Sequence, residues 1–172
     1  MKLPGIFKIM VITLSDRASA GEYEDLSGPQ LMQRLETFFP ENGWECKSEL
    51  ILIPDDDVKL RSLLIRGGEE YDLIFTTGGT GIGPKDITAD VVKPLLSKEI
   101  PGIMEYIRIR YGAEKPNALL SRGVAGIINK ALIFTLPGSV RAVNEYMDEI
   151  EKTLAHLIYM QYGIDRHGKI SG

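Results

Sequence analysis

Residues 76–86, TTGGTGIGPKD, place four glycines within six residues and follow them with a lysine and an aspartate. Successive N–H groups of a glycine-rich turn can form an anion-binding concavity, and a helix that starts just beyond adds positive potential. A strand-to-helix turn that binds no ligand is the alternative. The segment is not a P-loop, because Pro84 stands where that motif needs its lysine. The residues that we predict to bind a phosphate group are Thr77, Gly78, Gly79, Thr80 and Gly81.

Aspartates follow two of the expected strands, and they are candidates for metal binding. Asp55 comes after the run 50–53, and Asp86 ends the glycine-rich segment. Near a phosphate site such carboxylates are typical Mg²⁺ ligands, because Mg²⁺ is held by one or two carboxylates together with substrate phosphates and water. The same aspartates would also suit the first turn of a helix, where acidic side chains are stabilising. Both interpretations stay open on these residues alone.

Three further polar segments stand near strand ends and can contribute to the same site. Arg122, beside Ser121 and glycines, can clamp a phosphate through two hydrogen bonds, or can be a surface arginine next to a helix cap. In open parallel sheets, ligands bind outside the carboxyl ends of the strands. We therefore expect the segments after the strands to converge on one edge of the sheet. Two of these segments are Ser15, Asp16 and Arg17 after the first strand, and Pro137, Gly138 and Ser139 after the last.

Strands alternate with helices along the chain, which predicts a single α/β domain. Short apolar runs suit strands that are buried on both faces of a mostly parallel sheet, with helices on both faces. The expected strands are 7–14, 50–53, 73–76 and 131–136. The expected helices are 27–40, 58–68, 88–96, 104–111 and 140–158, with Ser27 as a cap and Gly67-Gly68 as a stop.

Composition limits the class of protein. The chain has 172 residues, which is enough for one domain with a substantial core. The net charge of −4 argues against a nucleic-acid partner, and one cysteine with two histidines argues against a zinc or iron–sulfur site. No apolar stretch is long enough for a membrane span. We expect a cytoplasmic protein whose domain is 1–172 and whose tail, 163–172, is mobile.

Five blocks of sequence together resemble the molybdenum cofactor biosynthesis family. They match in type and in order, and the resemblance covers about residues 7–160. The blocks are SDRAS-G-Y-D-SGP at 15–29, IPDD at 53–56, TTGGTG-GPKD-T-D at 76–90, LSR-VAGI-K at 120–130, and LPGS at 136–139.

The resemblance implies a fold, an activity and partners. The family fold is a three-layer α/β sandwich that usually forms a homotrimer. The adenylyltransferase branch uses ATP and Mg²⁺ to adenylylate molybdopterin, with handover to a molybdenum insertase. Aspartate at both acidic positions, Asp55 and Asp86, favours that branch and makes them the expected catalytic metal ligands. The alternative is a MoaB-type or non-catalytic molybdopterin-binding or scaffold protein. The glycine loop, residues 77–81, is expected to hold the nucleotide. The residues expected on the molybdopterin side are Ser121, Arg122, Pro137, Gly138 and Ser139, with Ser15, Asp16 and Arg17 at the rim.

Overall fold

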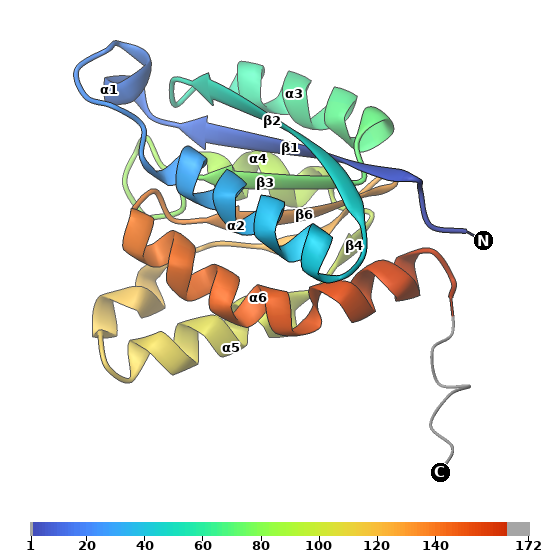
Figure 1. Cartoon of the computed structure of the whole chain (residues 1–172). Helices are drawn as coiled ribbons and strands as arrows, with labels where there is room; N and C mark the ends of the chain where they lie inside the picture. Colours follow the sequence, from blue (N-terminus) through green and yellow to red (C-terminus); the bar gives the residue numbers. More distant parts are fainter. Residues whose placement is uncertain (1, 165–172) are drawn as a thin grey trace.

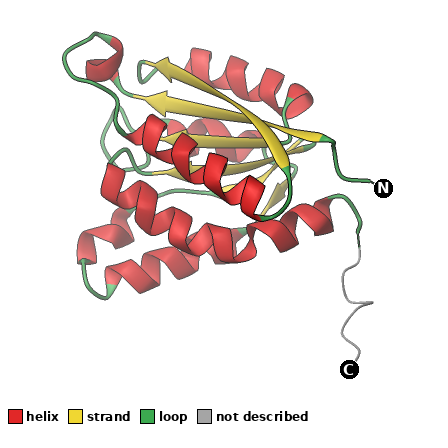
Figure 2. Ribbon diagram, viewed as in Figure 1, coloured by secondary structure: helices red, strands yellow, loops and turns green. Residues whose placement is uncertain are grey.

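The computed structural model describes residues 2–164, which form one six-stranded sheet between two layers of helices (Figures 1 and 2). The strands are β1 (Ile6–Leu14), β2 (Glu45–Ile53), β3 (Leu73–Thr77), β4 (Lys98–Glu99), β5 (Ala125–Ile128) and β6 (Ala131–Leu136). The helices are α1 (Asp16–Ser19), α2 (Ser27–Glu41), α3 (Asp57–Glu70), α4 (Thr88–Val92), α5 (Pro101–Gly112) and α6 (Val140–Gln161), with 3-10 turns η1 (Lys93–Leu95) and η2 (Pro116–Leu120). The predicted mobile tail falls largely on residues 165–172, outside the described part.

The sheet is mostly parallel, as the sequence predicts. Its strand order is β2-β1-β3-β6-β5-β4. Strands β2, β1, β3 and β6 run parallel, whereas β4 and β5 are antiparallel to their neighbours. The carboxyl ends of the four parallel strands therefore lie at one edge of the sheet.

Two apolar cores lie on the two faces of the sheet, because alternate residues of each strand point in opposite directions. On one face Phe7, Ile9 and Val11 of β1 pack with α2, α5 and α6. On the other face Met10 and Ile12 pack with α3 and α4. Figure 1 shows α2, α5 and α6 together on one side of the sheet. The prediction of a sheet with helices on both faces is confirmed.

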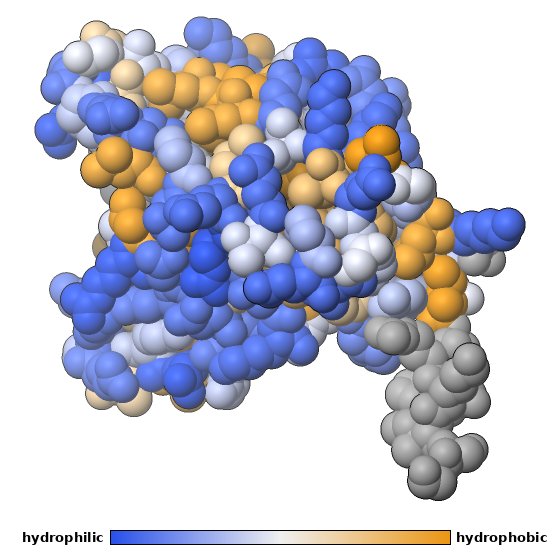
Figure 3. Space-filling view, in the orientation of Figure 1, coloured by the Kyte–Doolittle hydropathy of each residue, from blue (hydrophilic) through white to orange (hydrophobic). Residues whose placement is uncertain are grey.

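The outer surface above α2 and α6 is largely hydrophilic (Figure 3). An apolar area lies over β2, one of the two edge strands of the sheet, where Leu50 and Leu52 are exposed. Among the described residues, no helix is both long enough and apolar enough to span a bilayer.

Two predicted helix boundaries are wrong. The α3 helix continues through Gly67 and Gly68 to Glu70. These glycines allow close packing, since a Cβ on Gly67 would lie 2.6 Å from Met10 Cε, and one on Gly68 would lie 3.0 Å from Ile128 O. They therefore mark contact with the sheet and not the end of the helix.

At the start of α2, Asp25 caps the helix and Ser27 does not. Asp25 Oδ1 accepts hydrogen bonds from Ser27 N at 3.0 Å and Gly28 N at 3.1 Å.

Strand β2 also starts earlier than predicted, at Glu45. Its first five residues are mostly polar and alternate between exposed and half-buried positions, because an edge strand has an exposed side. The sequence does not predict the short strands β4 and β5.

Candidate active site

Polar and glycine-rich segments follow the four parallel strands at one edge of the sheet, which confirms the predicted convergence. Because the strands are neighbours in space, segments far apart in sequence meet there (Figure 1). The segments are 15–17 after β1, 54–56 after β2, 78–87 after β3 and 137–139 after β6.

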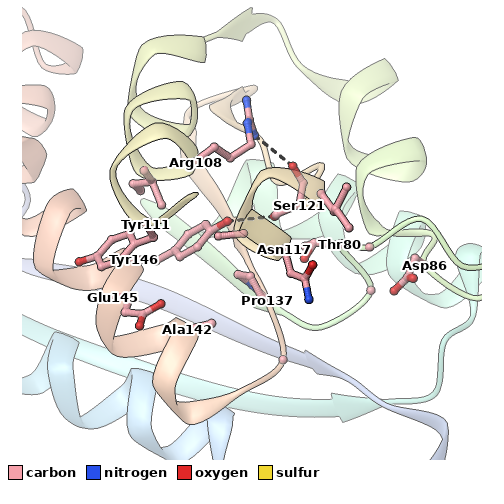
Figure 4. Close-up of a pocket in the computed structure, with 16 residues that line it drawn as sticks. Thr80, Asp86, Arg108, Tyr111, Asn117, Ser121, Pro137, Ala142, Glu145 and Tyr146 are labelled. Atoms are coloured by element: carbon pink, nitrogen blue, oxygen red, sulfur yellow. Dashed lines mark hydrogen bonds between the residues drawn. The ribbon is translucent and has the colours of Figure 1, made fainter. Parts of the chain in front are cut away.

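A hollow of about 340 Å³ opens at this edge, between the glycine loop, η2 and the start of α6. In Figure 4, Asp86 and Thr80 lie toward one end of it, and Tyr111 and Glu145 toward the other. One end is therefore formed by backbone and a carboxylate, and the other mainly by side chains of α5 and α6. The lining residues used below are Gly79, Thr80, Gly81, Asp86, Arg108, Ser121, Pro137, Gly138 and Tyr146.

The glycine loop has a backbone conformation that side chains would prevent. Gly78 and Gly79 have φ of +99° and +65°, a region that residues with a Cβ rarely adopt. A Cβ on Gly78 would lie 2.3 Å from Leu14 O, and one on Gly138 would lie 3.2 Å from Gly78 Cα. Thr88 holds the loop from behind, donating through Oγ1 to Gly78 O at 2.8 Å and through its N–H to Gly79 O at 3.0 Å.

The loop offers donors to an anion. Within residues 2–164 no hydrogen-bond partner is found for the N–H groups of Gly79, Thr80 and Gly81, all of which line the hollow. The 22-residue helix α6 begins beside Gly138, so its positive end adds to the potential there. Ser139 caps this helix, its Oγ accepting from Ala142 N at 3.1 Å. A phosphate-like group is the ligand that such donors suit.

Arg122 joins the glycine loop to the segment after η2. Its guanidinium donates to both carboxylate oxygens of Asp90, at 2.9 and 3.0 Å, to Gly81 O at 2.7 Å and to Asp86 O at 2.6 Å. The N–H of Arg122 also donates to Thr80 O at 2.8 Å. The two-bond clamp expected for a phosphate is thus made with Asp90, and the guanidinium holds the loop that surrounds the hollow.

An acidic group lies at the ends of β1 and β2, beside the glycine loop. Asp55 N donates to Asp16 Oδ1 at 3.0 Å, and Asp16 N donates to Asp55 Oδ2 at 3.2 Å. Lys85 pairs with Asp16, and this hydrogen bond lowers the pKa of Asp16. Burial raises the pKa of Asp55, and the charges of Asp16 and Asp86 raise it further. Asp86 itself accepts from Gly83 N at 2.8 Å.

This acidic group fits a Mg²⁺ ion that arrives with a phosphate ligand. No three His, Cys, Asp or Glu side chains in the described chain are grouped so as to hold a metal unaided. Mg²⁺ normally needs only one or two carboxylates, because phosphate oxygens and water complete its shell. The raised pKa of Asp55 reflects burial together with nearby negative charge, which a cation would relieve.

Some residues predicted for the site have other partners. Thr77 is fully buried, its hydroxyl donates to Ser27 Oγ at 2.7 Å, and it is not among the residues that line the hollow. Ser15 caps α1 and its hydroxyl lies 2.8 Å from Tyr23 Oη. Arg17 stacks on the Tyr23 ring at the exposed rim, where it also pairs with Glu22. Pro137 and Gly138, by contrast, line the hollow.

Sequence reasoning missed the wall formed by α5, η2 and α6. The helical spacing of Tyr146 in α6 predicts a core residue, and Tyr146 is indeed buried. Helix residues that line a pocket have the same spacing along the sequence as helix residues that face the core, so spacing cannot distinguish the two. For the remaining side chains of this wall the sequence holds no motif. The missed residues are Arg108, Tyr111, Asn117, Glu145 and Tyr146.

The fold and the site define an α/β domain in which a glycine-rich loop, suited to bind an anion such as phosphate, lies at the carboxyl edge of a mostly parallel sheet. Residues 10–156 match the family described as a probable molybdopterin binding domain. The chain is 36% identical to molybdopterin adenylyltransferase of Helicobacter pylori strain J99 over 157 residues, covering 90% of this chain and 88% of the relative. It is 37% identical to molybdenum cofactor biosynthesis protein B of Staphylococcus aureus strain MRSA252 over 163 residues, covering 92% and 94%. The chain therefore belongs to this molybdenum cofactor biosynthesis family.

Another relative is a much longer protein. Gephyrin of Dictyostelium discoideum is 36% identical over 155 residues, which is 86% of this chain, but the chain spans only 21% of gephyrin.

Solved structures agree with the family. The molybdopterin biosynthesis enzyme MoaB of Thermus thermophilus superposes with a TM-score of 0.81 at 32% identity, covering 91% of this chain and 97% of that one. A MogA structure gives a TM-score of 0.79 at 32% identity, covering 90% and 99%. The predicted resemblance and fold are confirmed.

Proposed function

We propose that this protein is a molybdopterin adenylyltransferase, which transfers AMP from ATP to the terminal phosphate of molybdopterin. The observation that carries the proposal is the row of N–H groups at Gly79, Thr80 and Gly81, for which residues 2–164 supply no acceptor, beside the start of α6 and close to Asp86. Relatives named molybdopterin adenylyltransferase cover most of the chain and support the same activity.

The reaction needs little proton transfer. An oxygen of the molybdopterin phosphate forms a bond to the α-phosphorus of ATP, and the bond from that phosphorus to the bridging oxygen breaks. Pyrophosphate leaves with the bonding electron pair. Because the attacking phosphate is already anionic at neutral pH, no strong base is required, and the chief tasks are charge neutralisation and in-line alignment.

The residues divide these tasks between them. The N–H groups of residues 79–81 and the start of α6 hold phosphate oxygens. Asp55 and Asp86 would hold Mg²⁺, with Asp16 as their neighbour. When bound, Mg²⁺ would neutralise the charge that develops on the leaving pyrophosphate. Arg122 keeps the glycine loop in place through Gly81 O and Asp86 O, and so acts on the substrate only through the loop.

Molybdopterin would lie in the hollow between the glycine loop and α6. Its 340 Å³ falls within the usual range for small-molecule sites. The phosphate would meet the glycine-loop end, and the pterin would meet the end formed by α5, η2 and α6. Pro137 and Gly138 shape the floor between them, and Ser121 lies on the wall.

Release of pyrophosphate tests the proposal. We expect release from ATP and Mg²⁺ only when molybdopterin is present, and a loss of release in Asp55→Ala and in Asp86→Ala. Release without molybdopterin would indicate another nucleotidyl transfer or hydrolysis. Binding of molybdopterin without any release would indicate a MoaB-type or non-catalytic binding protein.

We also propose that the protein acts as a homotrimer and passes its product to a molybdenum insertase. Light scattering at micromolar concentration tests the first point. Product transfer to an added insertase, measured against release into solution, tests the second.

A further inference from the structure

Tyr146 is a buried tyrosine whose hydroxyl is hydrogen-bonded to Ser121, a residue that lines the hollow. Its residue is only 5% exposed, and its ring lines the hollow from α6. Burial raises its pKa, so the phenol keeps its proton at neutral pH. The phenol donates to Ser121 Oγ at 2.9 Å, an interaction drawn in Figure 4.

The hydroxyl of Ser121 has both of its acceptor positions filled. It accepts from the Tyr146 phenol and, at 3.3 Å, from the N–H of Gly123. A serine hydroxyl has two lone pairs and one proton. In the part of the chain that is described, no acceptor is found for that proton. Ser121 therefore has only a donor left, and it lines the hollow.

The backbone that carries Ser121 is fixed on two sides. Arg108 Nη1 donates to Gly123 O at 3.1 Å and, more weakly, to Ser121 O at 3.4 Å. On the other side the N–H of Arg122 is bonded to Thr80 O. The backbone at Ser121 is therefore held in place, and the bonds from Tyr146 and Gly123 orient the hydroxyl itself.

The geometry points to Tyr146 as a positioning residue that turns Ser121 into an obligate hydrogen-bond donor toward an oxygen acceptor of molybdopterin. This inference rests on the proposed function, because it assumes molybdopterin in the hollow. The acceptor is either an oxygen of the phosphate or the carbonyl oxygen of the pterin. A ligand that presents a donor at this point would meet the Ser121 proton and be disfavoured.

Direct binding of molybdopterin, without ATP or Mg²⁺, tests the inference by isothermal titration. We expect Tyr146→Phe to weaken binding about tenfold, the size of one hydrogen bond to a charged or polar ligand atom. Ser121→Ala should weaken binding to a similar extent. The double variant should bind no more weakly than Ser121→Ala alone, because Tyr146 acts only through Ser121.

Tyr162→Phe is the matched control. Tyr162 follows the last residue of α6 and its hydroxyl donates to Asp72 at 2.7 Å, away from the hollow. The same substitution there removes a hydrogen bond of similar length, and we expect molybdopterin binding to stay unchanged. Phosphate-free 6-hydroxymethylpterin and inorganic phosphate serve as two further ligands. The ligand whose affinity falls in Tyr146→Phe identifies which oxygen Ser121 contacts.

Three results would overturn the inference. The first is wild-type affinity for molybdopterin in Tyr146→Phe, and the second is additive losses in the double variant. The third is an equal loss of ATP affinity with a lower unfolding temperature, which would make Tyr146 merely structural. If the wild-type protein bound no molybdopterin, the proposed function itself would fail. The three results above, obtained with a wild type that binds molybdopterin, would contradict only the role of Tyr146.

Discussion

The two halves of the site are held in different ways. The glycine loop is fixed by Thr88 from behind and by Arg122 from the side, through backbone oxygens of Gly78, Gly79 and Gly81. The acidic half has fewer supports. Asp55 and Asp16 are bonded to each other, and Asp16 is paired with an exposed lysine.

The difference between the two halves is that the glycine loop supplies a fixed geometry, whereas the acidic half supplies negative charge. A rigid loop can present N–H groups in a fixed geometry, which lowers the cost of organising donors around a phosphate. In the acidic half, by contrast, the negative charge of Asp55 is unfavourable, since burial raises the pKa of this carboxyl in the folded protein. We infer that the loop contributes to folding and binding, whereas the acids contribute mainly to catalysis.

Asp55→Asn should give the largest effect and separate the two halves most clearly. We expect the rate of adenylyl transfer to fall about 100-fold to 1000-fold, as when one charge-stabilising group is removed from a transition state. The unfolding temperature should stay the same or rise. The raised pKa of Asp55 means that the folded protein disfavours a negative charge at this position, and asparagine removes that charge. Steady-state kinetics and thermal melts measure both. A large fall in stability with little loss of rate would contradict the comparison.

Gly78→Ala should mainly affect folding. The residue has φ of +99°, and an added Cβ would lie 2.3 Å from Leu14 O. We expect a loss of about 2–4 kcal/mol in the free energy of unfolding, measured with urea. Gly21→Ala is the control, because Gly21 has φ of +77° but no atom near the added Cβ. Equal losses in both variants would mean that backbone conformation alone, and not contact with β1, requires glycine.

Arg122→Lys should show how far the fixed loop matters for the reaction. Lysine keeps the charge but loses the paired bonds to Asp90 and the bond to Gly81 O. We expect the molybdopterin-dependent rate to fall about tenfold, which corresponds to the free energy of about one hydrogen bond to a charged group. Arg66→Lys, at a surface pair with Glu70, should leave the rate unchanged. An unaltered rate in Arg122→Lys would show that the loop holds its shape without this tie.

The pH dependence of stability at Asp90 should be the smallest effect. Its hydrogen bond with Arg122 lowers the pKa of Asp90. The stabilising contribution is therefore present above the ordinary pKa of aspartate, about 3.9, and is lost as pH falls through the lowered value. Because the Asp90 side chain is largely exposed, we expect a small difference in unfolding temperature between wild type and Asp90→Asn at neutral pH. That difference should disappear in strong acid, below the lowered pKa, and its persistence there would exclude the ion pair as the cause.

The meeting of the polar segments at the candidate site could be predicted from sequence, because the carboxyl ends of parallel strands lie at one edge of a sheet. The loop glycines at 78 and 79 could also be predicted as a special backbone. Their φ values and the crowding at Gly78 give the physical reason.

The partners of individual side chains could not be predicted. Nothing in the local spacing shows that Arg122 would pair with Asp90 on a different segment. Thr77 has the same local pattern as Thr80, yet its hydroxyl turns toward Ser27 in α2. Tyr146 keeps a core spacing and also contacts a pocket residue. Each of these depends on the packing of distant elements, which local sequence does not specify.

Label transfer tests the central claim most directly. Wild-type protein would be incubated with molybdopterin, Mg²⁺ and ATP that carries a radioactive phosphorus at either the α or the γ position. We expect label to move to molybdopterin from α-labelled ATP alone, and γ label to appear only in pyrophosphate. Label on molybdopterin from γ-labelled ATP, or from neither form, would contradict adenylyl transfer by this protein.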